Sequence, residues 1–184
     1  IPVAVKDIIG TVDMPTECGT IIRKGKSYSQ NAEIIDLLHA SGALVMGKTA
    51  TSELAYLGPS KTTNPNDYSR TPGGSSSGSA ASVASYMAPL SIGSQTGGSI
   101  IRPASYCGVV GYKPSYGLIS RNGVLRTSYA LDQMGVFAKR VEDAALLAKI
   151  LIKKDQHDPA TIYYSAENIL EETKKGPLFE PKFI

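Results

Sequence analysis

The sequence predicts an α/β fold with a mixed, largely parallel sheet that is flanked by helices. Short apolar runs of strand length alternate with longer segments whose apolar residues recur at helical spacing. Hydrophobic residues make up 42% and charged residues 19% of the 184 residues, which are ordinary values for a globular protein. A chain of this length can form one domain with a core of its own. Such an alternation of strands and helices is typical of layered α/β architectures.

The first half of the expected fold is a strand, a helix and a second strand. Segments 3–5 and 43–46 are short apolar runs and are predicted to be strands. Between them, the apolar residues of 32–38 recur at helical spacing. Asn31 is the expected N-cap of this helix, and Gly42 is expected to end it.

Two further helices are expected, at 51–56 and 140–154. The second has the clearest pattern, because its apolar residues form one stripe and lysines occupy its C-terminal half. Both ends of the sequence resemble cut strands: 1–5 begins without an initiator methionine, and 179–184 resembles a chain entering another strand. The chain is therefore expected to be truncated at both ends.

Two clusters rich in glycine and serine lie between these flanks, at 73–82 and 93–99. A flexible linker is the simplest interpretation of such a composition. The first cluster, however, continues into 83–87, whose mostly small residues suit a tightly packed buried helix. Two such turns on either side of a helix of small residues favour a functional site over a linker.

Composition and spacing argue against several classes of function. The formal net charge of +3 is small, and the densest basic stretch, 23–26, has no interleaved aromatic residues, so no nucleic-acid partner is expected. No apolar run approaches the roughly 20 residues that span a bilayer, so no membrane partner is expected. Cys18 and Cys107 form neither a disulfide framework nor a metal-binding pair, and no metal or other cofactor is expected. These features fit a reducing, cytoplasmic setting.

The histidines do not suit a histidine-based hydrolase. Segment 74–78 formally matches GxSxG, the nucleophile elbow of α/β-hydrolases, which requires a histidine base. Both histidines, His39 and His157, are expected at the surface. No SxxK motif occurs, and 19–27 differs from a phosphate loop because five residues, not four, separate its glycines. A truncated chain could lack its histidine, so the nucleophile elbow stays open, but a serine nucleophile with another base is favoured.

A buried lysine can replace histidine as that base. A serine hydroxyl is a weak nucleophile until a neighbour removes its proton, and a lysine amine can do so when burial keeps it neutral. Lys6 follows an apolar strand-like run and is expected to be half buried at the edge of a sheet. A lysine that reaches solvent from a strand end is the alternative. In 96–99, two glycines precede Ser99 and can direct successive backbone N–H groups at one point, as an oxyanion hole requires.

The motifs around these residues resemble those of the amidase signature family. The resemblance runs from residue 1 to about residue 151, and it implies that 1–184 is part of a single amidase signature domain. The matching blocks lie at 1–7 (IPVAVKD), 47–49 (GKT), 71–79 (TPGGSSSGS), 97–99 (GGS), 102–108 (RPASYCG), 111–117 (GYKPSYG) and 131–135 (LDQMG).

Enzymes of this family hydrolyse amides, or transfer their acyl groups, with a Ser–cisSer–Lys triad. The resemblance implies that Ser99 is the nucleophile, that Ser75 bridges it to the base after a cis Gly74–Ser75 bond, and that Lys6 is the terminal base. It also implies a small-molecule amide substrate and an acyl-enzyme intermediate, with a homodimer as one option. The expected N–H donors of the oxyanion hole are those of Thr96, Gly97, Gly98 and Ser99 itself.

Two departures from the family pattern narrow the resemblance. Gln95 stands where many members carry Asp, and Arg102 follows the nucleophile by three positions instead of two. This form resembles a branch that includes malonamidase-type small-amide hydrolases. Arg102 is therefore expected to pair with a substrate carboxylate, because a guanidinium group suits bidentate capture. A structural ion pair is supported equally well.

Two other functions stay open. The chain could be a glutaminase-type subunit of a tRNA-dependent amidotransferase, or a catalytically inactive fragment or binding subunit of this fold. Cys107 is expected to be a small buried residue and not a nucleophile. Four further residues match the family and are expected to be structural: Asp7, Lys48, Lys113 and Asp132.

Overall fold

The computed structural model describes residues 1–176 and 180. The described part contains the strands β1 (Pro2–Lys6), β2 (Leu44–Thr49), β3 (Leu90–Gln95), β4 (Val110–Tyr112) and β5 (Gln133–Ala138). Its α-helices are α1 (Glu33–Ala40), α2 (Ser77–Ala84), α3 (Ile101–Cys107), α4 (Val141–Leu151) and α5 (Ile169–Glu172). Two 3₁₀-helices are also present, η1 (Ile21–Arg23) and η2 (Glu53–Ala55).

The strands form one mixed sheet in the order β2-β1-β3-β5-β4 within the described residues. β1 pairs in parallel with β2 and with β3, whereas β5 is antiparallel to both β3 and β4. β5 therefore runs against the common direction of the other four strands. This arrangement confirms the expected mixed, largely parallel sheet.

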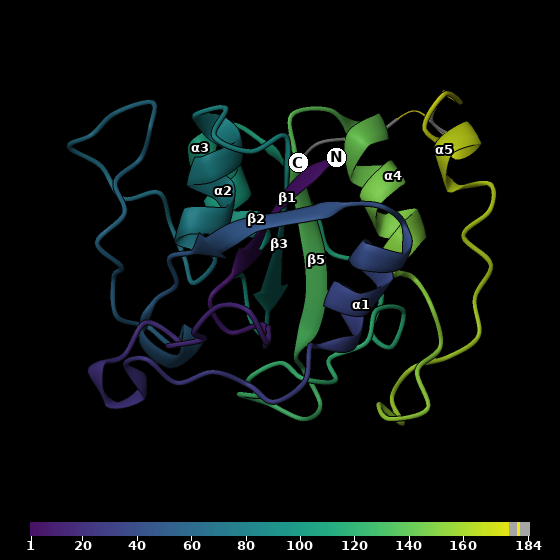
Figure 1. Cartoon of the computed structure of the whole chain (residues 1–184). Helices are drawn as coiled ribbons and strands as arrows, with labels where there is room; N and C mark the ends of the chain where they lie inside the picture. Colours follow the sequence, from purple (N-terminus) through teal and green to yellow (C-terminus); the bar gives the residue numbers. More distant parts are fainter. Residues whose placement is uncertain (177–179, 181–184) are drawn as a thin grey trace.

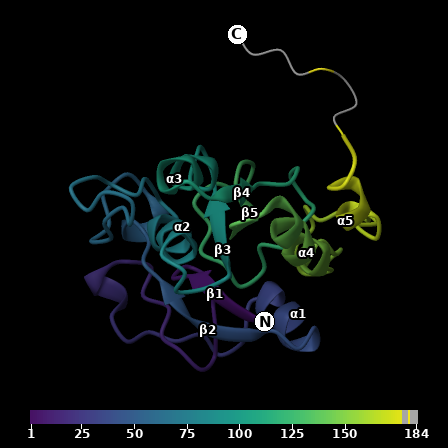
Figure 2. The same cartoon turned by 90° about the horizontal axis from the view of Figure 1, so that it is seen from above.

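Helices cover both faces of the sheet, and the chain reverses its direction of winding at β1. Figures 1 and 2 show α1 and α4 on one face and α2 and α3 on the other. The chain passes from β1 to β2 through α1 and from β2 to β3 through α2, on opposite sides of β1. Helices on opposite faces are expected when both crossovers have the same hand. In open α/β sheets, ligands bind at the carboxyl ends of strands beside such a reversal, which here lies between β1 and β3.

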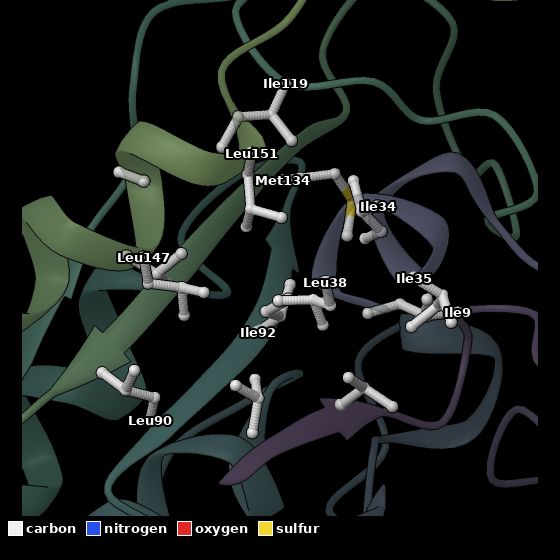
Figure 3. Packing of buried hydrophobic residues seen from close by; sticks show 14 of the residues in the cluster. Ile9, Ile34, Ile35, Leu38, Leu90, Ile92, Ile119, Met134, Leu147 and Leu151 are labelled. Atoms are coloured by element: carbon white, nitrogen blue, oxygen red, sulfur yellow. The ribbon is translucent and has the colours of Figure 1, made fainter. Parts of the chain in front are cut away.

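The larger hydrophobic core lies between the sheet and the helices α1 and α4. Figure 3 shows side chains of both helices meeting those of β3 and β5. These side chains are removed from water almost completely, and burial of each contributes about 1.5–3 kcal/mol. The labelled members from these elements are Ile34, Ile35, Leu38, Leu90, Ile92, Met134, Leu147 and Leu151.

A second, smaller core holds α2 against α3 and β5. All eight residues of α2 are buried, as expected from its small residues, but the helix ends at Ala84 and does not continue through 83–87 as expected, and Tyr86 and Met87 are exposed. A Cβ added at Gly78 would lie 2.4 Å from the backbone nitrogen of Ala50, so only glycine allows this approach. The buried serines of α2 return their hydroxyls to backbone oxygens: Ser79 donates to Ile92 and Ser82 donates to Ser79, each at 3.0 Å. The helix is therefore a tightly packed element and not a linker.

Most of the other expected elements are present, with three further corrections. Asn31 is not the N-cap of α1, because Ala32 occupies that position and the Asn31 side-chain oxygen accepts the N–H of Val12 instead. The helix expected at 51–56 is reduced to η2, where Leu54 has a φ of 50°. The helix expected at 140–154 is α4, which ends at Leu151, before the final lysines of the expected range. The strand expected at 179–184 lies outside the described residues, except for position 180.

No helix in the described part of the chain has both the length and the apolar character needed to cross a membrane.

Candidate active site

Lys6 ends β1 with its side chain completely buried. Its amine Nζ lies 2.8 Å from Oγ of Ser75 and 2.9 Å from Oγ of Ser94, at hydrogen-bonding distance from both. Burial lowers the pKa of Lys6 from 10.5 to about 7, although the negative charge of Asp132 opposes the shift. The lysine is thus more deeply buried than the sequence suggested, and a large share of its amine is neutral near pH 7.

Ser75 lies in the loop before α2 and is 2% exposed. The Gly74–Ser75 peptide bond is cis, as the resemblance implied. Next to it, the Ser76 hydroxyl donates to the Ser94 carbonyl at 3.0 Å, and the Ser76 N–H donates to the Ser99 carbonyl at 3.3 Å. Ser76 therefore attaches the loop that carries Ser75 to the segment that carries Ser99.

The glycine-rich turn between β3 and α3 is closed by the side chain of Gln95. Its buried Oε1 accepts the N–H groups of Ile100 at 2.9 Å and Ile101 at 3.1 Å. Glutamine can thus provide the acceptor that a carboxylate would provide at the position where the sequence departs from the family pattern. The turn is also held by Thr96, whose hydroxyl donates to Oδ1 of Asp132 at 2.5 Å.

Ser99 is half-buried in this turn. Among the described residues, no hydrogen bond joins its hydroxyl to another group, so Ser75 is hydrogen-bonded to Lys6 but not to Ser99. Within the same residues, no acceptor is found for the N–H groups of Thr96, Gly97, Gly98 and Ser99. No atom lies within 4 Å of a Cβ built on Gly97, and the space over the turn is open.

Arg102 lies on α3 beside the loop that carries Ser75. Its Nε and Nη2 both donate to the carbonyl of Gly74, at 3.1 Å and 2.7 Å. The guanidinium also borders a cavity of about 240 Å³ that Ser52, Gly74 and Tyr106 help to line. The structure therefore gives Arg102 a backbone partner, where the sequence suggested a substrate carboxylate or an ion pair.

The other family-matching residues have structural contacts. Asp7 accepts the N–H of Glu17 at 3.0 Å, and Lys113 donates to Oε1 of Gln133 at 2.6 Å. Lys48 donates to the carbonyl of Ile9 and to the Thr16 hydroxyl. Burial lowers the pKa of Lys48 to about 8, against the attraction of Asp7.

The histidines and Cys107 lie as expected. His39 and His157 are both exposed. Cys107 is 1% exposed, and burial raises the pKa of its thiol to about 11, which disfavours the nucleophilic thiolate. No group of three or more metal-ligating side chains is found within the described residues.

The sequence did not single out Ser94, Ser76 or Gly93 as parts of this site. Ser94 is the second hydroxyl at the Lys6 amine. A Cβ on Gly93 would lie 2.7 Å from the Ser76 hydroxyl, so this glycine allows β3 to approach the loop. The signal for them was their place in the two glycine- and serine-rich segments, 73–82 for Ser76 and 93–99 for Gly93 and Ser94, because single serines are common in any sequence.

Comparison with known proteins yields one family. The family model described as Amidase matches residues 1–178, beyond residue 151, where the expected resemblance ended. The chain is 44% identical over 170 residues to a glutamyl-tRNA(Gln) amidotransferase subunit of Methanosarcina mazei, and the alignment covers 88% of this chain and 35% of that protein.

Solved structures agree with this result. The crystal structure of a glutamyl-tRNA(Gln) amidotransferase subunit from Thermotoga maritima matches with a TM-score of 0.86 and 42% identity, over 90% of this chain and 38% of that one. The native peptide amidase from Stenotrophomonas maltophilia matches with a TM-score of 0.86 and 35% identity, over 95% of this chain and 38% of that one. The chain thus spans well under half the length of these relatives.

Proposed function

The chain belongs to the amidase family, and from this premise we propose that it carries the catalytic centre of an enzyme that hydrolyses a carboxamide C–N bond. Lys6, Ser75 and Ser99 are the proposed triad. The observation that carries the proposal is the fully buried Lys6 amine, with a pKa of about 7, at 2.8 Å from the Ser75 hydroxyl. A base with a pKa near the working pH is the most efficient proton acceptor.

The first half of the reaction transfers the acyl group to the enzyme. Ser99 Oγ attacks the amide carbon, its proton moves to Ser75 Oγ, and the Ser75 proton moves to the neutral Lys6 amine. The carbonyl π electrons move to the oxygen, which accepts N–H groups of the turn. Each such donor contributes about 2.7–4 kcal/mol to the stability of the transition state. The proposed donors are the N–H groups of Thr96, Gly97, Gly98 and Ser99, for which the described residues supply no acceptor.

The second half releases the products. The C–N bond breaks as Ser75 gives its proton to the leaving nitrogen and regains one from the Lys6 ammonium. Water then attacks the ester at Ser99 by the same proton path, and the carboxylate leaves. A neutral amine has one lone pair and two N–H groups, so Lys6 can accept from Ser75 while it donates to Ser94.

Ammonia release from a panel of small carboxamides tests this proposal, with the full-length protein and its Ser99→Ala variant compared. Turnover that disappears in the folded variant is the expected result. Labelling of Ser99 by an acylating probe adds a readout that does not depend on the substrate panel. A folded protein with neither turnover nor labelling would favour the inactive or binding role.

A second candidate is the glutaminase-type subunit of a tRNA-dependent amidotransferase. The relative in Methanosarcina mazei and the Thermotoga maritima structure both bear the name of such an amidotransferase, and their identities to this chain are 44% and 42%. The peptide amidase, by contrast, favours the hydrolase. Ammonia release from glutamine that depends on added partner subunits would select the amidotransferase, and turnover of other amides by the protein alone would select the hydrolase.

Arg102 is proposed to bind a substrate carboxylate at the edge of the cavity beside Gly74. Its Nη1 is not used in the contact with the Gly74 carbonyl, which supports this role. Arg102→Ala should then raise KM for acidic amides and leave KM for neutral amides unchanged. An equal loss of kcat for both substrate classes would instead indicate that Arg102 acts by holding the loop of Ser75.

The proposed setting is the cytoplasm, since both cysteines are buried and unpaired. A homodimer remains part of the proposal, and its test is the mass of the full-length protein in solution.

A further inference from the structure

Asp132 connects two separate parts of the site. It precedes β5, is 8% exposed, and its carboxylate accepts four hydrogen bonds. Oδ1 accepts the hydroxyls of Thr96 at 2.5 Å and Thr127 at 2.8 Å. Oδ2 accepts the N–H groups of Thr127 at 2.7 Å and Ser128 at 2.9 Å. These bonds favour the ionised form, and although burial opposes them, the pKa of Asp132 is lowered.

We propose that Asp132 is a positioning residue of the amidase centre, which fixes the turn of Ser99 through Thr96 and places a negative charge near Lys6. The inference rests on the proposed function and deepens it. Asp132 does not touch the reacting atoms. It acts through Thr96 on the geometry of the turn and through its charge on the proton affinity of the base.

The mechanical effect follows from where Asp132 is anchored. Thr96 begins the turn whose N–H groups have no acceptor among the described residues, and its bond to Asp132 ties this turn to the segment before β5. The backbone of that segment is held independently, because Nη1 of Arg121 donates to the carbonyls of Tyr129 at 2.8 Å and Asp132 at 3.4 Å. Arg121 in turn forms a buried ion pair with Asp158 at 2.8 Å. Preorganised donors are effective only when they do not have to reorient during the reaction.

The electrostatic effect follows from what surrounds Lys6. Its two contacts, Ser75 and Ser94, are neutral hydroxyls. Ser94 and Asp132 line the same small cavity at the end of the sheet. The other charged groups near this end have partners of their own: Asp7 accepts backbone N–H groups, Lys48 donates to Ile9 and Thr16, Arg121 pairs with Asp158, and Arg126 lies over the ring of Tyr129. Asp132 is the charge that stabilises protonated Lys6 against burial.

The two effects predict different results for two substitutions. Asp132→Asn removes the charge and weakens the tether, so kcat should fall about 10- to 100-fold and the acid limb of the pH profile of kcat/KM should move to lower pH. Thr96→Val removes the tether but keeps the charge. Thr96→Val should lower kcat without moving the acid limb of the pH profile to lower pH. Thr96→Ser, which keeps the hydroxyl, should restore kcat.

The experiment measures these profiles on the full-length protein and also titrates Lys6 directly by NMR. The protein is labelled with ¹³Cε-lysine, and the Lys6 signal is assigned by its loss in the Lys6→Met variant. A lower pKa of Lys6 in the Asp132→Asn protein than in the wild type is expected. Asp36→Asn, which removes an exposed carboxylate from α1, is the matched control and should change neither readout.

The NMR titration separates this inference from the proposed function, because it needs no substrate. Loss of all amide turnover in the wild type would refute the function, while a lowered Lys6 pKa in Asp132→Asn would still support the charge effect. An unchanged Lys6 pKa in the folded variant overturns the proposal. If Asp132→Asn does not fold, the two Thr96 variants test the proposal instead. Equal kcat in Thr96→Val and Thr96→Ser would overturn it.

Discussion

Replacing Lys6 by methionine should make the protein more stable at neutral pH. The lysine is completely buried, and burial lowers its pKa from 10.5 to about 7. Between these two values the unfolded chain binds a proton that the folded protein releases, so the stability of the wild type rises with pH. Each pH unit corresponds to about 1.4 kcal/mol. The lysine therefore destabilises the fold by about 5 kcal/mol well below pH 7, by about 4 kcal/mol at pH 7, by about 3 kcal/mol at pH 8, and not at all above its unfolded pKa.

Methionine removes this destabilisation, but it also removes two hydrogen bonds. Its side chain is unbranched like that of lysine, but Ser75 and Ser94 lose the amine as a partner. Each lost bond costs about 1 kcal/mol. The net gain of Lys6→Met should be about 2 kcal/mol at pH 7 and should pass through zero near about pH 9.

Urea denaturation of both proteins from pH 6 to pH 10 measures this difference, provided that the two proteins have equal m-values. Lys153→Met removes an exposed lysine beyond α4 and should show no such dependence on pH. A Lys6→Met protein that is less stable at pH 7, or a difference that is constant from pH 7 to pH 10, would refute the reasoning. Either result would mean that the buried amine is charged in the folded protein at neutral pH.

Three further predictions concern the same elements. The kcat/KM for amide hydrolysis should rise with pH through about 7 as Lys6 loses its proton, and a profile that is flat from pH 5 to pH 9 would contradict the role of Lys6 as base. Gly78→Ala should lower the free energy of unfolding in urea by about 3 kcal/mol through overpacking against Ala50, whereas Gly97→Ala, in open space, should change it by less than about 1 kcal/mol. Gln95→Leu leaves two N–H groups without an acceptor and should lower the stability by about 2 kcal/mol and slow the labelling of Ser99; unchanged values of both would contradict the capping role.

Local sequence patterns predicted the elements with a continuous apolar run or a regular apolar stripe, and they missed elements whose pattern is interrupted by polar residues, glycine or proline. The stripe in 140–154 predicted α4, and the apolar spacing of 32–38 predicted α1. β3 (Leu90–Gln95) is buried along almost its whole length but contains two serines and a glycine, so it lacks an apolar run. α3 (Ile101–Cys107) is short and contains a proline, which conceals its helical pattern.

The residues of the candidate site were likewise predicted only in part. Motif resemblance pointed to Lys6, Ser75 and Ser99, and the structure brings the first two into contact. It could not indicate Ser94, which meets Lys6 across 88 positions of sequence through the pairing of β1 with β3. It also could not assign a partner to Asp132, because the tether to Thr96 exists only once β3 and β5 have paired.

The distance along the chain between the parts of the site has a consequence for refolding. β1 and β3 are neighbours in the sheet although the whole of α1, β2 and α2 lies between them in the sequence. Contacts between such distant segments form late, because closing a long loop loses entropy before any contact compensates for it. During refolding, the helical circular dichroism signal should therefore recover before the ability of Ser99 to react with an acylating probe. The rate at which Ser99 regains its reactivity toward the probe would then report the rate of the last step of sheet assembly.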